Sequence, residues 1–107
     1  MSLQSVVLSL ISDIPDPGIR HDVASTVYFL RDVYINGKIS LEDLKRELTD
    51  IVNTVLDVTH PELLPEEKKK KVDMLVDQLL RAIKMDTLRI RMLRKFSQSP
   101  ATSSAPF

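Results

Sequence analysis

Apolar residues recur at three- and four-residue intervals along most of the chain, which is the spacing of one face of an α-helix. The pattern predicts helices over residues 3–13, 17–35, 41–58 and 65–96. No segment alternates apolar and polar residues as a half-buried strand would. Because the connections are short, we expect an all-α fold: a small antiparallel bundle of three shorter helices and one long C-terminal helix.

Residues with strong positional preferences mark the predicted helix ends. Asp16 can cap the second helix, with Pro17 at the first helical position, where a missing N–H costs nothing. Asn36-Gly37 can end this helix because both residues tolerate a left-handed backbone. Ser40, followed three residues later by an acid, can begin the third helix as a capping box. Both connections are therefore defined by cap chemistry.

The predicted fourth helix carries two apolar faces. Its first half has one continuous stripe, made of Val72, Leu75, Val76, Leu79, Leu80, Ala82 and Ile83. Beyond Lys84 that face is diluted, since it meets Asp86, Thr87 and Arg94. A second apolar set lies more than 90° around the helix at about 100° per residue, and consists of Met85, Leu88, Met92 and Phe96.

Two interpretations explain this change of face. A break near residues 84–87 would fold the last segment back onto the bundle. A continuous helix would instead leave the bundle and offer its second apolar set to another molecule. Methionine suits such a surface because its flexible thioether adapts to several shapes.

Charge is unevenly distributed, although the chain carries 15 basic and 15 acidic residues. Residues 1–37 hold four acids and two bases, and residues 38–64 hold six acids and three bases. Residues 65–107 hold five acids and ten bases, so an acidic front precedes a basic back. The bases of the last predicted helical segment are Arg81, Lys84, Arg89, Arg91, Arg94 and Lys95, against the single acid Asp86.

Residues 32–43, "DVYINGKISLED", resemble a calcium-binding EF-hand loop over these twelve residues alone. Such a loop takes oxygen ligands from alternate positions around a glycine at position six, here Gly37. Tyr34 occupies the third position without a carboxylate or amide oxygen, and the arm of Asp43 is short for bidentate binding. We expect no metal site here, and interpret the stretch as a turn between two helices. The side chains that would have to serve as ligands are Asp32, Asn36, Ser40 and Asp43.

Little else in the sequence points to catalysis. The absence of cysteine excludes disulfides and thiolate chemistry. No glycine-rich phosphate loop or serine-nucleophile motif occurs. His21 lies off the apolar stripe of its predicted helix, and His60 precedes a proline in a connection, so neither suggests a catalytic group. We therefore predict that the protein is not an enzyme and needs no cofactor.

Composition and length suggest the domain organisation and the location. A chain of 107 residues has the usual size of one domain, so residues 1–96 are predicted to form it. Residues 97–107 are uncharged and rich in Ser, Pro and Ala, which predicts a disordered tail. No run approaches the roughly 20 apolar residues of a membrane span, and residues 1–15 lack the basic start of a secretory signal. With no cysteine, these features favour the cytoplasm.

The predicted function is a non-catalytic helical interaction module, a small subunit or adaptor of a larger assembly. It would bind a protein partner, or a second copy of itself, through the Met/Phe-containing end of the fourth helix. One alternative is an accessory nucleic-acid-binding protein that uses the basic side chains of the same helix to neutralise phosphates. The other is a degenerate EF-hand-like, calcium-responsive module.

Overall fold

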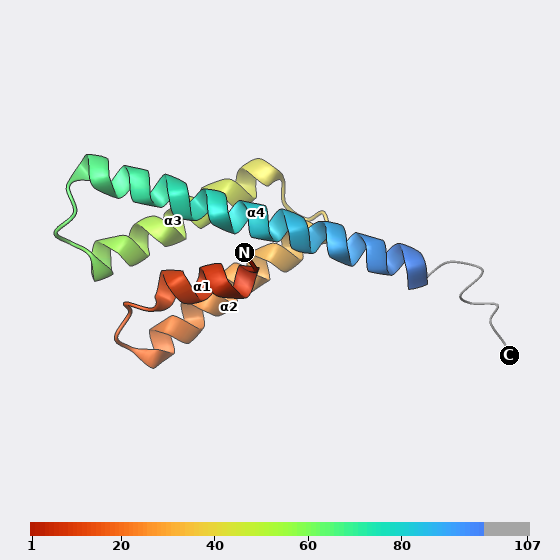
Figure 1. The fold of residues 1–107 in the computed structure, drawn as a ribbon, viewed down its shortest axis with the longest axis horizontal. Helices are drawn as coiled ribbons and strands as arrows, with labels where there is room; N and C mark the ends of the chain where they lie inside the picture. The colour runs from red at the N-terminus through yellow and green to blue at the C-terminus, as the bar shows by residue number, and fades with distance from the viewer. Residues whose placement is uncertain (98–107) are drawn as a thin grey trace, which may run out of the picture.

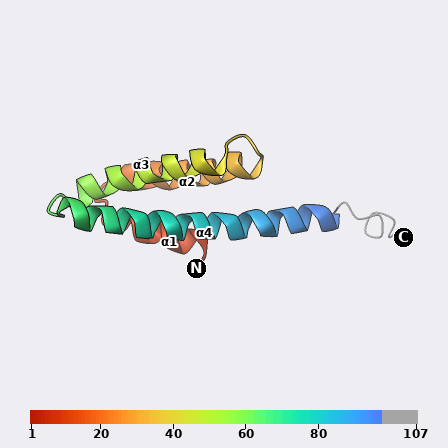
Figure 2. The ribbon, with the colours of Figure 1, turned by 90° about the horizontal axis from the view of Figure 1, so that it is seen from above.

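Four antiparallel α-helices make up the described part of the chain, residues 1–97, in a computed structural model. They are α1 (Leu3–Ile11), α2 (Pro17–Ile35), α3 (Leu41–Thr59) and α4 (Pro65–Ser97). The helices form two layers, with α1 beside α4 and α2 beside α3 (Figures 1 and 2). The predicted all-α antiparallel bundle, with its long last helix and no strand within these residues, is therefore confirmed.

The helix ends are those that the cap residues predict. Asp16 accepts a hydrogen bond from the backbone N–H of Gly18 at 2.7 Å, and Pro17 is the first residue of α2. Gly37 adopts a φ of 73° and donates to Tyr34 O at 3.0 Å. This left-handed glycine ends α2, since a side chain at that φ would be strained.

Three predicted boundaries, the ends of α1, α3 and α4, are wrong by one or two residues. α3 includes Thr59, one residue beyond its predicted end. α1 ends at Ile11 and not at residue 13, and a turn follows it in which the backbone N–H of Ile14 donates to Ile11 O at 3.0 Å. α4 includes Ser97, which was expected to open the tail. The remaining part of the predicted disordered tail, residues 98–107, lies outside the described residues.

A reciprocal capping box begins α3. Asp43 N–H donates to Ser40 Oγ at 3.0 Å, and Ser40 N–H donates to the Asp43 carboxylate at 3.2 Å. The backbone N–H and the side chain of Ser40, together with Arg46, hold the pKa of Asp43 below its usual 3.8. Because the pKa is lowered on folding, this stabilisation is present above pH 3.8 and is lost as the pH falls through the lowered value.

We expect Ser40→Ala to lower the free energy of unfolding by about 1 kcal/mol, since the hydroxyl that caps α3 is lost. The pKa of Asp43 should rise only partway, because the backbone N–H of residue 40 remains. Urea denaturation and a carboxyl-carbon NMR titration measure the two effects. Thr49→Ala, which removes a hydroxyl from the middle of α3, is the control. An unchanged pKa in Ser40→Ala would contradict the assignment.

The core is a single apolar cluster to which all four helices contribute. Two apolar residues that have the helical spacing of the core are exceptions: Ile19, one turn before Val23, is 52% exposed, and Leu41, one turn before Leu44, is 40% exposed. Both lie in the first turn of a helix, where neighbours cover only part of the circumference. Ile35, which lies off the helical spacing of Val27 and Leu30 on α2, is instead buried. The core residues with almost no exposed surface are Val6, Val7, Val27, Leu44, Leu48, Val52, Leu79 and Ile83.

The fourth helix is much longer than its neighbours. It has 33 residues, against 19 in each of α2 and α3, which makes it about 20 Å longer at 1.5 Å per residue. Its C-terminal end therefore projects past the α2–α3 connection (Figure 1). Within residues 1–97, no helix is long and apolar enough to cross a membrane.

Candidate interaction surface on α4

No break interrupts α4 where the apolar face changes. The helix is continuous from Pro65 to Ser97, and it contains no glycine and no second proline. Thr87 is only 6% exposed, and its hydroxyl donates to Ile83 O at 2.8 Å. A polar residue is thus accommodated on the buried face without unwinding the helix. The interpretation that folds the last segment back onto the bundle is wrong.

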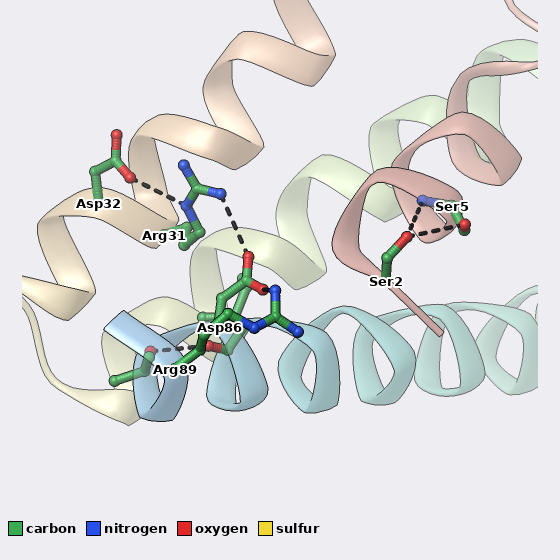
Figure 3. A network of polar contacts seen from close by, with 8 residues as sticks. Ser2, Ser5, Arg31, Asp32, Asp86 and Arg89 are labelled. Carbon is green, nitrogen blue, oxygen red and sulfur yellow. Dashed lines mark hydrogen bonds and ion pairs between the residues drawn. The ribbon is translucent and has the colours of Figure 1, made fainter. Parts of the chain in front are cut away.

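Asp86 anchors α4 to α2 just before the helix leaves the bundle. Its carboxylate lies 3.3 Å from Arg31 and 3.7 Å from Arg89 (Figure 3). Arg31 also pairs with Asp32 at 3.0 Å and lies over the Tyr28 ring, 5.1 Å from its centroid. The single acid of the basic segment therefore faces the bundle, and its negative charge is neutralised by Arg31 and Arg89.

One further bond ties the projecting segment to the α2–α3 connection. Arg94 donates to the side-chain oxygen of Asn36 at 3.5 Å. Apart from the half-buried Ile90, the side chains after Thr87 in the described chain are exposed. The bundle therefore stops supporting α4 about two turns before its end.

The second apolar set lies on the side of α4 that faces away from the core. We call it the outer stripe: Met85, Leu88, Met92 and Phe96, which are 58%, 56%, 48% and 62% exposed. Their spacing keeps all four on one face of the helix. Met74, 49% exposed, precedes them on the same face. The structure brings these predicted residues together, while their role in binding stays a prediction.

Sequence reasoning missed two apolar neighbours of the outer stripe. Leu93 continues the core face by its spacing, yet it is 61% exposed because the bundle has ended. The difference in length between α4 and its neighbours is the sequence signal that reveals this. Met1 and Met85 line a hollow of about 300 Å³, together with Arg81. No sequence pattern places Met1 there.

The six predicted basic residues divide into two groups. Arg81 pairs with Asp77 at 3.0 Å, and Arg89 and Arg94 have the partners described above. Within residues 1–97, no carboxylate lies within 4 Å of Lys84, Arg91 or Lys95. By helical position, these three side chains lie along one side of the outer stripe. The C-terminal part of α4 therefore presents an apolar stripe that is bordered by positive charge.

The four side chains of the EF-hand-like stretch have other roles. Asp32 pairs with Arg31, and Asn36 accepts the bond from Arg94. Ser40 and Asp43 cap α3, and Asp43 also pairs with Arg46 at 2.9 Å. Among residues 1–97, no group of three or more His, Cys, Asp or Glu side chains could hold a metal ion.

The two histidines lie far from α4's projecting end. His21 is exposed on α2, with Nε2 3.4 Å from Ser25 Oγ. His60 joins two connections, because its Nε2 lies 2.8 Å from Asp13 and its Nδ1 lies 3.3 Å from Glu62. These contacts give His60 a structural role between the α1–α2 and α3–α4 connections.

Comparison with protein-family models, curated proteins and solved structures finds no match to this chain. The surface is therefore interpreted from its own geometry.

Proposed function

We propose that the chain is a non-catalytic protein-binding module, a small subunit or adaptor, whose binding surface is the outer stripe. One observation carries the proposal: α4 projects beyond the bundle and exposes four apolar side chains on a single face. Contiguous exposed apolar patches are uncommon on monomeric proteins and mark interaction sites. An amphipathic helix that enters an apolar groove is a common mode of recognition.

The charges around the outer stripe indicate the chemistry of the partner. Lys84, Arg91 and Lys95 are exposed, and the only acid nearby in the sequence, Asp86, is already paired. A partner groove with an apolar floor and acidic edges fits this surface. The absence of cysteine is consistent with a cytoplasmic location, which belongs to the same proposal.

An accessory nucleic-acid-binding function is the alternative. It uses the same basic side chains, but leaves the exposed Met85, Leu88, Met92 and Phe96 unexplained. Its affinity would fall steeply with salt, because each neutralised phosphate releases a counterion. The calcium-responsive interpretation is not proposed, because Asp32 and Asp43 already have partners.

Photo-cross-linking in the native host tests the proposal. A photoreactive amino acid at position 88 should give a discrete adduct that protease removes and nuclease leaves intact. The same group at position 8, where Leu8 is equally exposed on α1, is the control and should give none.

Met92→Ser with Phe96→Ser should abolish the adduct, whereas Leu8→Ser with Leu64→Ser should leave it. A nuclease-sensitive adduct would support the alternative, and no adduct would reject the proposal.

A further inference from the structure

A second surface of the molecule has the opposite character to the outer stripe. Between α2 and α3 lies an open groove of about 300 Å³. Its floor is formed by Val23, Ile51 and Val55, and its charged lining residues are all acidic: Asp22, Glu47 and Asp50. We call it the α2–α3 groove. The two helices that line it, α2 and α3, form the layer opposite α4 (Figure 2).

The hydroxyl groups of the groove are already hydrogen-bonded within α2 and α3, whereas its carboxylates are not paired with basic side chains of residues 1–97. Its two threonines, Thr26 and Thr54, donate to the carbonyls of Asp22 and Asp50, each at 2.8 Å. Within the described chain, no Lys, Arg or His nitrogen lies within 4 Å of the carboxylates of Asp22, Glu47 or Asp50. The groove thus combines an apolar floor with unneutralised negative charge.

Exposed apolar side chains extend this face in both directions. Ile19 lies one turn before Val23 on α2, and Phe29 lies two turns after Asp22. They are 52% and 63% exposed. On α3, Val58 lies two turns after Ile51 and is 69% exposed. The face from Ile19 to Phe29 is about 15 Å long at 1.5 Å per residue.

This face and the outer stripe match in length and charge. The outer stripe runs from Met85 to Phe96, about 17 Å at the same rise. Lys84, Arg91 and Lys95 border the stripe without acidic partners among residues 1–97, as Asp22, Glu47 and Asp50 border the groove without basic ones. Complementary potentials of this kind orient two surfaces and select between partners.

Two outer stripes fit each other less well. If the α4 helices of two copies paired antiparallel, stripe to stripe, Lys84 and Arg91 of each would lie next to bases of the other. Such like-charge contacts oppose association. Pairing of the outer stripe with the acidic α2–α3 groove avoids this repulsion. The two surfaces also match the distribution of charge along the sequence, because the chain is acidic before residue 65, where the groove lies, and basic after it, where the stripe lies.

We propose that the α2–α3 groove of one copy binds the outer stripe of a second copy, so that the chains associate head to tail. The inference rests on the proposed function, because it takes the outer stripe as one of the two surfaces. A contact between different surfaces is heterologous, and it produces a ring if the rotation closes and an open chain if it does not.

Mixing two complementary variants tests the proposal. The stripe variant carries Met92→Ser and Phe96→Ser, and the groove variant carries Glu47→Lys and Asp50→Lys. Sedimentation velocity of the full chain at rising concentration should show wild-type species larger than a dimer. Each variant alone should be monomeric at concentrations where the wild type associates. Association should weaken at least about a hundredfold in the stripe variant, which loses two apolar side chains, and at least about tenfold in the groove variant. Their equimolar mixture should form a 1:1 dimer, since one intact groove meets one intact stripe.

A second pair of charge reversals controls for net charge. Glu42→Lys with Asp73→Lys adds the same charge away from the groove, at two exposed positions, and should associate like wild type. Circular dichroism and thermal unfolding confirm that every variant is folded.

Each other outcome overturns a defined part of the inference. A groove variant that associates like wild type, beside a monomeric stripe variant, would mean that stripes pair with stripes. The inference would then fail and the proposed function would stand. A wild-type monomer, or two monomeric variants that do not form the mixed dimer, would also overturn head-to-tail binding and leave a different protein as the partner. A stripe variant that associates like wild type would overturn the inference and remove self-association as support for the proposed function.

Discussion

Replacing Leu79 with alanine is expected to lower the free energy of unfolding by about 3 kcal/mol. Leu79 has no exposed surface and lies in the middle of α4 within the apolar cluster. The substitution loses the transfer free energy of the removed carbons and leaves a cavity that a close-packed interior fills only partly. In a domain of this size the midpoint of thermal unfolding should fall by about 15 °C.

The matched control is the same substitution on the same helix. Leu88 is 56% exposed on the outer stripe, so Leu88→Ala should change the free energy of unfolding by less than about 0.5 kcal/mol. Urea denaturation of both variants under one set of conditions measures the difference. Similar losses in the two variants would mean that Leu88 is packed in the bundle, which contradicts the placement of the outer stripe.

Local chemistry made most of the fold predictable. The caps at Asp16, Gly37 and Ser40 act through neighbours in the sequence, so spacing alone identifies them. The stripe of α3 was also predictable, because that helix has one apolar face along its whole length. The exposure of Ile19 and the burial of Ile35 were not predictable, since burial near a helix end depends on how far the neighbouring helices extend, and helical periodicity does not contain that information.

The candidate surface was predictable only in part, because helical periodicity identifies the faces of α4 but not which of them the bundle covers. The change of face at Lys84 is visible in the sequence, but periodicity alone leaves a break and a continuous helix equally open. The continuous helix accommodates Thr87 on its buried face through the hydrogen bond to Ile83 O. Many threonines can make this bond, so the sequence alone does not favour a continuous helix over a break. The exposure of Leu93 follows from the lengths of α2 and α3. The α2–α3 groove needs the fold, because Val23 and Ile51 are 28 positions apart in the sequence.

Ending the chain at Ile90 is expected to separate binding from stability, and is compared with a chain that ends at Ser97. Residues 91–97 are all exposed, so the shorter chain should unfold within about 0.5 kcal/mol of the longer one. The truncation removes Met92 and Phe96, and burying two such side chains contributes about 3 kcal/mol or more. Binding through the outer stripe should therefore weaken at least about a hundredfold.

The two chains should be measured side by side, by urea denaturation for stability and by sedimentation velocity and cross-linking from position 88 for binding. The chain ending at Ser97 is the control because it removes only residues 98–107, so its binding should equal that of the full chain. If the chain ending at Ile90 still binds, Met85 and Leu88 suffice and the surface is shorter than proposed. If it unfolds far more easily, the last two turns of α4 contribute to the bundle and the separation of the two roles is wrong. Unchanged stability with lost binding is the result expected of a projecting, partner-binding end of α4. Leu79→Ala is expected to give the opposite result: lower stability, with binding retained wherever the chain is folded.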